Sequence, residues 1–433
     1  MKKLICALTL SVSAVVSAAP VVSDVIVRQQ WPWNTSVNVD FIVSGTIGGV
    51  SQVSLKAYRG EILLGDIPTT ALSGDVLIRA DGAKRVLFNP ADVPVLSGQS
   101  TMGDFRVDVS VSGSENFLYA IFDLTKNAGE QGALTFVTEE ALTNGAWGAW
   151  QRGPCGMLPD SVIWTGVTAD DRYKTTHLVM RRIPAGSFSY GEAADATYRD
   201  TSSITSKVVM ITKPYYIGVF ELTVAQKAII LNKSSSSTNK TPADYVYWNY
   251  PGTSAMRGYG AEATLANWPT DKTISSNSLM GQLRSRTGCA TFDLPTEAQW
   301  EKAARAGSSG PYYHTNAETL NASSISPYAW YQGNYGSGGL KDVGQKLPND
   351  YGLYDALGNV EECVLDWGVK GYIPDDEDPE GPVAAGADLA NKRVLRGGRV
   401  WLELGKIRLG FRSFGTCTSY QNQGGLRVCC AAF

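Results

Sequence analysis

The chain has 433 residues, with 38 basic and 41 acidic side chains and 43% hydrophobic residues. Its charge is nearly balanced and no run of Lys or Arg exceeds two residues, which argues against the clustered basic surface of a nucleic-acid-binding protein, so we expect no nucleic-acid partner. The length exceeds what one hydrophobic core usually serves and predicts two or three domains.

Residues 1–18 are typical of a secretory signal peptide. Two lysines precede an apolar run from Leu4 to about Val16, and small residues follow at the cleavage position. We therefore expect an exported mature protein that begins near Ala19 and is periplasmic, secreted or on the cell surface. Cys6 lies at the start of the apolar run rather than after it, too early for a lipid-modified cysteine, so we expect no lipid anchor. No second apolar stretch approaches the roughly 20 residues of a membrane-spanning helix, so we expect no membrane span.

Six cysteines remain after removal of the signal peptide. An oxidising compartment favours disulfide bonds between them. Six cysteines allow fifteen pairings, and the sequence does not choose among them. They are Cys155, Cys289, Cys363, Cys417, Cys429 and Cys430.

Residues 19–125 consist of short runs with β-strand character, separated by clusters of Gly, Pro and Asp. Several runs alternate apolar and polar residues, as strands do when one face lies on a core, and no segment has a helical period. This pattern predicts a small antiparallel β-sandwich of the immunoglobulin-like type, with no recognisable chemistry. The clearest runs are Ser36–Val43, Val50–Ala57, Arg85–Phe88 and Phe105–Val111.

Residues 126–176 form a predicted connector, and residues 177–433 a predicted α+β domain. We interpret the connector's Trp147, Trp150 and Trp164 as packing anchors, with a sugar-stacking platform as the alternative. The α+β domain is rich in Gly, Tyr, Trp and Asn and has few periodic segments. Its clearest helix begins at the capping box Thr296-Glu297-Ala298-Gln299 and ends before Gly307, and a second helix is predicted near 223–231.

Six spaced motifs occur in order between residues 177 and 430. Together they resemble the formylglycine-generating enzyme, or sulfatase-modifying factor, family. The resemblance implies a C-type-lectin-like α+β fold with sparse regular structure. Members of the family include oxidases, proteins that serve iron-dependent sulfur chemistry beside a separate histidine-bearing domain, and proteins that only bind a ligand. The motifs are IPAGSF at 183–188, YYIGVFELT at 215–223, LPTEAQWEKAARAG at 294–307, NDYGLYDALGNVEE at 349–362, RVLRGG at 393–398 and GLR at 425–427.

The resemblance implies where an oxidase centre would lie. Oxidase members bind copper(I) with two cysteines between the Arg-Gly-Gly motif and the following Arg-rich strand, because soft thiolates suit that ion. The corresponding segment, Gly398–Arg412, contains no cysteine, so copper is not expected. A relocated thiol site built from Cys417, Cys429 and Cys430 remains an alternative. Iron chemistry of the ergothioneine-synthase kind needs a histidine cluster, and the chain has only two histidines.

The segment 355–362 resembles the family's calcium loop. The resemblance implies that the side chain of Asp355, the carbonyls of Gly358 and Val360 and the carboxylate of Glu362 bind the ion. These hard oxygen ligands suit Ca²⁺. The alternative is a turn held by carboxylate hydrogen bonds without metal. We interpret the acidic stretch 375–380 as a solvated loop rather than a second site.

The chain departs from the family pattern near the expected substrate groove. Glu361 and Cys363 stand where tryptophans are usual, and Arg399 stands where a serine is usual. These replacements argue against the oxidase substrate. Aromatic and guanidinium groups suit a carbohydrate or protein ligand. The candidate ligand surface consists of Arg399, Trp401, Arg408, Arg412 and Tyr420. The alternative is that Arg408 and Arg412 brace the fold through buried ion pairs.

The leading hypothesis is an exported, non-oxidase binding module for a carbohydrate or an exported protein. The alternative is a formylglycine-generating oxidoreductase that acts on sulfatases or another exported substrate, with an unusual arrangement of cysteines. A further possibility is that residues 399–424 form a ligand-specific variable surface. Because one fold hosts many activities, the resemblance predicts the fold more firmly than the role.

Overall fold

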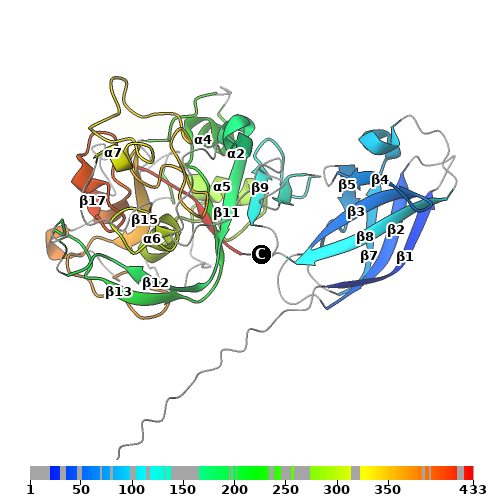
Figure 1. Cartoon of the computed structure of the whole chain (residues 1–433), viewed down its shortest axis with the longest axis horizontal. Helices are drawn as coiled ribbons and strands as arrows, with labels where there is room; N and C mark the ends of the chain where they lie inside the picture. Colours follow the sequence, from blue (N-terminus) through cyan, green and yellow to red (C-terminus); the bar gives the residue numbers. More distant parts are fainter. Residues whose placement is uncertain are drawn as a thin grey trace, which may run out of the picture. The chain divides into compact units, whose positions relative to one another are not determined.

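The structure, a computed structural model, divides the chain into two compact units, Met1–Asn116 and Phe117–Phe433 (Figure 1). It describes residues 20–29, 36–45, 51–68, 71–78, 81–97, 104–113, 118–130, 132–137, 165–194, 196, 198–200, 202–233, 238–244, 255–257, 274–313, 322–382, 386–389, 392–416 and 424–432. Within these residues no helix has the length and apolar character needed to cross a membrane.

The first unit consists of antiparallel strands in two sheets. One sheet has the order β1-β2-β7-β5, and the other has the order β4-β3-β6 with β8 also paired to β3. The strands are β1 (Val21–Gln29), β2 (Val37–Ser44), β3 (Ser51–Arg59), β4 (Ile62–Ile67), β5 (Leu72–Gly74), β6 (Leu77–Ile78), β7 (Gly82–Phe88) and β8 (Phe105–Gly113), with short 3₁₀ turns η2 (Pro90–Asp92) and η3 (Pro94–Leu96).

Alternation of side chains builds the core of this unit. In β2, Val37, Val39, Phe41 and Val43 are buried while the residues between them are more exposed, because successive side chains of a strand point to opposite faces. Buried residues of both sheets share one hydrophobic cluster. The four predicted β runs correspond to β2, β3, β7 and β8, so the prediction of a β-rich, antiparallel first domain is confirmed.

The boundary between the units lies earlier than the predicted position after residue 125. β9 (Tyr119–Asp123) pairs with β11 (His177–Ile183), which belongs to the second unit, and β10 (Leu134–Val137) pairs with β9. Part of the predicted connector is therefore sheet. The three tryptophans interpreted as packing anchors lie outside the described residues.

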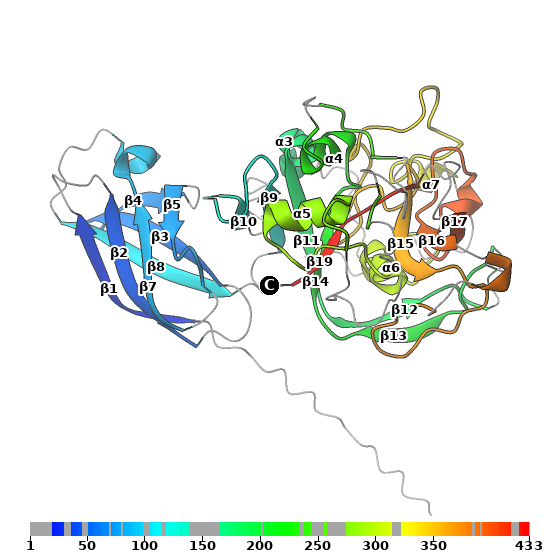
Figure 2. The ribbon, with the colours of Figure 1, turned by 180° about the vertical axis from the view of Figure 1, so that it is seen from behind.

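The second unit has little regular structure for its length. A five-stranded sheet has the order β10-β9-β11-β14-β19, a four-stranded sheet has the order β17-β16-β15-β18, and β12 pairs with β13 (Figure 2). The remaining strands are β12 (Gly186–Tyr190), β13 (Lys207–Ile211), β14 (Tyr215–Gly218), β15 (Glu361–Trp367), β16 (Lys392–Arg396), β17 (Ser413–Thr416), β18 (Gly424–Gly425) and β19 (Cys429–Ala431). The helices are α2 (Thr165–Ala169), α3 (Arg172–Thr175), α4 (Val224–Ile230), α5 (Leu279–Thr287), α6 (Glu297–Arg305) and α7 (Ala322–Ile325), with 3₁₀ turns η6 (Ala387–Leu389) and η7 (Leu404–Lys406).

Both predicted helices are present, and capping explains where they begin. The Thr296 hydroxyl accepts a hydrogen bond from the Gln299 backbone N–H at 3.2 Å, and the Gln299 side chain accepts one from the Thr296 N–H at 2.9 Å. This capping box starts α6, and Thr223 with Gln226 starts α4 in the same way. All nine residues of α6 are buried, so this helix lies within the core of the unit.

Candidate functional site

The loop that carries the predicted calcium ligands lies in a fixed backbone position. Gly358 has a φ of +80°, and a Cβ at this residue would lie 1.9 Å from the Trp330 carbonyl oxygen, so only glycine fits. The Gly358 N–H donates to the Gly397 carbonyl at 2.8 Å, and the Asn359 N–H donates to the Trp330 carbonyl at 3.0 Å. The loop is thus held between the segment at 330 and the Arg-Gly-Gly motif.

Asp355 is almost completely buried at the start of this loop, with 1% exposure. Its Oδ2 accepts a hydrogen bond from the Gly344 N–H at 2.7 Å, whereas its Oδ1 has no hydrogen-bond partner among the described residues. Burial raises the pKa of Asp355 to about 6. An unsatisfied buried carboxylate oxygen is costly, so this atom is the feature of the loop that best suits a cation.

The carboxylate of Glu362 is held by protein groups. Its Oε1 lies 2.7 Å from Arg427 Nη2, and its Oε2 accepts hydrogen bonds from Arg427 Nε at 3.0 Å and from the Trp300 indole N–H at 2.6 Å. Both of its oxygens are therefore already engaged. The alternative reading of the loop, a turn held by carboxylate hydrogen bonds, describes Glu362 well.

Sequence reasoning missed a third buried acid beside this loop. Glu221 follows β14, and its carboxylate accepts hydrogen bonds from Asn359 Nδ2 at 2.7 Å and from the Val360 N–H at 3.1 Å. Burial, together with the negative charges of Asp355 and Glu362, raises the pKa of Glu221 well above its usual range. A charged residue inside the apolar run YYIGVFELT was the available signal, because such a residue is rarely buried without a specific partner.

The three acids and Arg427 form a buried cluster with more carboxylates than guanidinium groups. Arg427 is itself fully used, because it also donates to the carbonyls of Gly218, Val219 and Tyr354. Within the described part of the chain, no three His, Cys, Asp or Glu side chains are grouped so that they could hold a metal ion. A calcium ion at this loop would thus depend on Asp355 and on backbone carbonyls, and calcium binding stays a prediction.

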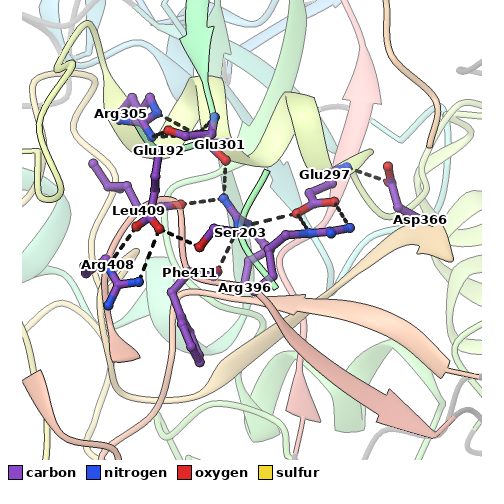
Figure 3. Close-up of polar contacts among 12 residues, drawn as sticks. Glu192, Ser203, Glu297, Glu301, Arg305, Asp366, Arg396, Arg408, Leu409 and Phe411 are labelled. Carbon is purple, nitrogen blue, oxygen red and sulfur yellow. Dashed lines mark hydrogen bonds and ion pairs between the residues drawn. The ribbon is translucent and has the colours of Figure 1, made fainter. Parts of the chain in front are cut away.

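Two of the five residues assigned to the candidate ligand surface are buried instead. Figure 3 shows Arg408 directed at Glu192, with its Nε 2.8 Å from Glu192 Oε1. Arg412 Nε and Nη2 lie 2.8 and 3.0 Å from the two oxygens of Glu297 on α6. Arg408 and Arg412 are 3% and 1% exposed. Their assignment to a ligand surface is therefore wrong, and the alternative, that they brace the fold through buried ion pairs, is correct.

Further charged groups extend this bracing network around α6 (Figure 3). Glu301 accepts hydrogen bonds from Arg305 Nε at 2.7 Å, from Arg396 Nη2, and from the Gly191 N–H at 2.7 Å. The Glu297 N–H donates to Asp366 Oδ2 at 2.6 Å. Burial raises the pKa of Asp366 well above its usual range, with the nearby charge of Glu297 adding to the effect. Each acid of α6 thus has a cationic partner from another part of the chain or from its own last turn.

Arg399 and Trp401 remain near the surface. Trp401 is 37% exposed, and the Arg399 guanidinium lies 6.0 Å from the centroid of its ring. Arg399 Nη1 lies 3.4 Å from Glu361 Oε2, and burial raises the pKa of the Glu361 carboxyl. Two of the departures from the family pattern, Glu361 and Arg399, are therefore partners of each other. Tyr420, the fifth assigned residue, lies outside the described residues.

The described thiols do not lie where an oxidase centre is expected. Cys429 and Cys430 are completely buried on β19, and burial raises the pKa of both thiols well above the usual range. As successive residues of a strand they point to opposite faces, so their sulfur atoms do not converge on one metal ion. Cys363 lies on β15, and Cys417 lies outside the described residues.

Comparison with known proteins identifies the family. Residues 167–432 match the sulfatase-modifying factor enzyme 1-like domain. The chain is 27% identical over 252 residues to a formylglycine-generating enzyme of Streptomyces coelicolor, an alignment that spans 50% of this chain and 77% of that protein. Two solved structures each match 59% of the chain. Treponema denticola variable protein 1 is 23% identical, with a TM-score of 0.44 and 96% of that protein covered. PvdO from Pseudomonas aeruginosa is 22% identical, with a TM-score of 0.40 and 94% of that protein covered. Because this match covers more than half of the 433 residues, the chain belongs to the sulfatase-modifying factor, or formylglycine-generating enzyme-like, family.

Proposed function

We propose that this protein is an exported member of its family that binds a carbohydrate or an exported protein and does not oxidise a sulfatase cysteine. The observation that carries the proposal is the composition of residues 398–412, which contain no cysteine. Copper-dependent oxidation requires a soft thiolate pair at that place in the resembling oxidases. The paired Glu361 and Arg399 add support, because they replace residues that lie near the peptide groove of the oxidases.

The binding surface that we propose includes Trp401 and Arg399. A partly exposed indole offers a face for a sugar ring or an apolar side chain, and a guanidinium offers several donors in a fixed plane. The ion pair with Glu361 supports this role because it restrains the guanidinium beside the ring. Tyr420 stays part of the proposal on sequence grounds alone.

Binding and oxidation are separated by one experiment. The mature protein is incubated with a peptide that carries the sulfatase Cys-x-Pro-x-Arg motif, copper, oxygen and a thiol reductant, and the peptide is analysed by mass spectrometry beside an active family enzyme. We expect no conversion to formylglycine. Conversion would establish the alternative, a formylglycine-generating oxidoreductase with relocated cysteines.

The ligand is sought with labelled mature protein on a glycan array and against exported proteins. For a ligand found in this way, Trp401→Ala and Arg399→Ala are expected to weaken binding at least about tenfold, the change that follows from losing about 1.4 kcal/mol. Arg172→Ala is the matched control, because Arg172 is an exposed arginine in an ion pair with Asp170 at 2.6 Å, outside the proposed surface. Equal binding by all three variants would contradict the assignment of this surface.

We also propose that calcium binds at the loop 355–362. The unsatisfied Oδ1 of Asp355 and the excess of buried carboxylates support the proposal, because a divalent cation would compensate both. Calcium should then raise the midpoint of thermal unfolding of the mature protein, and Asp355→Ala combined with Glu362→Ala should abolish that rise. A wild-type protein whose unfolding midpoint does not respond to calcium would exclude the site.

Export and the type of the first unit complete the proposal. The charged and apolar composition of residues 1–18 supports cleavage by a signal peptidase, which N-terminal sequencing of the secreted or periplasmic protein tests directly. Two antiparallel sheets around one core support an immunoglobulin-like spacer or adhesion module. Detection of an uncleaved chain in the cytoplasm would contradict the export.

A further inference from the structure

The end of the chain lies against the loop that follows α5. Asp293 and Cys429 form an antiparallel bridge, in which the Asp293 N–H donates to the Cys429 carbonyl at 2.8 Å and the Cys429 N–H donates to the Asp293 carbonyl at 2.7 Å. On its other edge β19 pairs with β14, where Tyr216 lies opposite Cys430. The bridge therefore fixes the position of the loop 288–292 beside β19, although the two segments are far apart in sequence.

Strand geometry decides which cysteine of β19 faces this loop. Cys429 belongs to the hydrophobic cluster that contains Ile183, Ala298 and Leu353. Cys430 must then point to the opposite face of the sheet. This places it on the side of Cys289, and each of the two thiols shifts the pKa of the other, as neighbouring groups do. The structure thus places two thiols in contact across a buried interface, with Cys289 only 7% exposed and Cys430 completely buried.

The surroundings make the two thiols unequal. The hydrogen bond from Cys430 lowers the pKa of Cys289 to about 7, and Thr291 and the charge of Arg284 act in the same direction. The Thr291 hydroxyl lies 3.4 Å from the Cys289 sulfur. Burial raises the pKa of Cys430. Cys289 is therefore the thiol that ionises first and attacks as a nucleophile.

We propose that Cys289 and Cys430 are a disulfide-forming pair that is oxidised when the chain reaches an oxidising compartment. The oxidant is a disulfide, either a small-molecule disulfide such as oxidised glutathione or the active-site disulfide of an oxidoreductase. The Cys289 thiolate attacks one sulfur of that disulfide, and a thiolate leaves. The Cys430 sulfur then attacks the Cys289 sulfur and expels the second thiolate. Two protein thiols are oxidised, one disulfide is reduced to two thiols, and these take up the two protons.

This bond would fasten the last strand of the second unit. It would close a covalent loop from residue 289 to residue 430 that contains α6, the loop 355–362 and the segment with Arg399 and Trp401. Cross-links that close long loops constrain the unfolded chain most. The inference depends only on how the bridge between Asp293 and Cys429 places the two cysteines, so it holds whether the protein binds a ligand or catalyses a reaction.

Peptide mapping of the full mature chain tests the pairing. The protein is equilibrated with oxidised glutathione, alkylated without reduction and digested with trypsin, which releases Cys289 in residues 287–302 and Cys430 in residues 428–433. We expect these two peptides to be linked, with a mass about 2 Da below the sum of the thiol forms. Cys429→Ala should keep the link, and Cys430→Ala should abolish it and leave Cys289 as a mixed disulfide with glutathione or as an alkylated thiol.

Other outcomes of the same mapping overturn the inference. Complete alkylation of Cys289 in the oxidised wild-type protein would do so, and so would a link from Cys289 to Cys155, Cys417 or Cys429. The wild-type chain decides whether Cys289 is linked to residues 428–433, and Cys429→Ala decides which of the two cysteines in that peptide takes part, so the test does not depend on whether the Cys430→Ala variant folds. It is also independent of the formylglycine and ligand-binding assays, so a failure here leaves the proposed function untouched.

Discussion

The buried pair of Arg412 and Glu297 allows a sharp test of the bracing network. Arg412→Met keeps most of the side-chain volume but removes two contacts to Glu297, at 2.8 and 3.0 Å. It also removes hydrogen bonds to the carbonyls of Ser202 at 3.1 Å and Val369 at 2.7 Å. Breaking a buried ion pair by removal of one partner typically costs about 3–5 kcal/mol, because the other charge stays buried.

We expect this loss in the free energy of unfolding of the second unit, measured by urea titration with tryptophan fluorescence. Arg396 Nη1 remains 3.4 Å from Glu297, which places the expected value toward the lower end of that range, about 3 kcal/mol.

Arg399→Met is the matched control for this measurement. Arg399 makes one ion pair near the surface, with its side chain 31% exposed. The Glu361 side chain is 4% exposed, but the partly exposed guanidinium leaves the pair close to solvent, so we expect a smaller loss than for Arg412→Met. Burial raises the pKa of Glu361, so this acid can take up a proton when its partner is absent. The reasoning is refuted if the two variants lower the free energy of unfolding by the same small amount.

Three further predictions concern the second unit. Thr296→Ala should lower the free energy of unfolding by about 1 kcal/mol, because α6 loses its N-cap. Thr296→Ser should retain most of that stability, because serine also has a capping hydroxyl, and urea titration measures both variants. Gly358→Ala should prevent folding of the unit, seen as rapid proteolysis, because the new Cβ would meet the Trp330 carbonyl. The control Gly371→Ala should be tolerated far better, because Gly371 has a positive φ but open space around it. Equal resistance of the two variants to protease would contradict the argument. Burial lowers the pKa of His177, and the positive charges of Arg172 and Lys126 act in the same direction. The negative charges of Asp123 and Asp170 raise this pKa but do not cancel the effect, so the unfolded chain binds the proton more tightly than the folded chain. Stability should therefore fall as pH drops below about 6.5 and level off below the folded-state pKa, and His177→Gln should flatten this part of the profile of unfolding midpoint against pH.

Features that depend on neighbouring residues could be predicted from the sequence. The capping box at Thr296 and the alternating run of β2 each specify their structure within a few residues, and both are present in the structure. The order of six motifs predicted the family in the same way, because each motif can be recognised where it stands.

Features that depend on distant partners could not be predicted. Arg408 looks like a surface residue in the sequence, and its partner Glu192 is 216 residues away. Glu221 meets Asn359 across 138 residues, so the sequence indicated at most that Glu221 has a partner, and not that this partner lies in the loop 355–362. The domain boundary was misjudged for a related reason, since β9 has the texture of the first unit but pairs with β11. In each case a tertiary contact, rather than local propensity, decided the environment of the residue.

The separation between α6 and its counter-charges has a consequence for how the protein is made. Arg396 lies 95 residues after Glu301, and Arg412 lies 115 residues after Glu297, so both acids emerge from the ribosome long before these partners. Burying Glu297 earlier would leave its charge without compensation in an apolar interior, whereas Glu301 also has Arg305 in its own helix. The helix can therefore take its final place only when translation of the domain is nearly complete, and contacts of such long range make folding slow. A newly made chain would thus stay open until its last segments arrive, and this delay would keep it unfolded for the export that we propose.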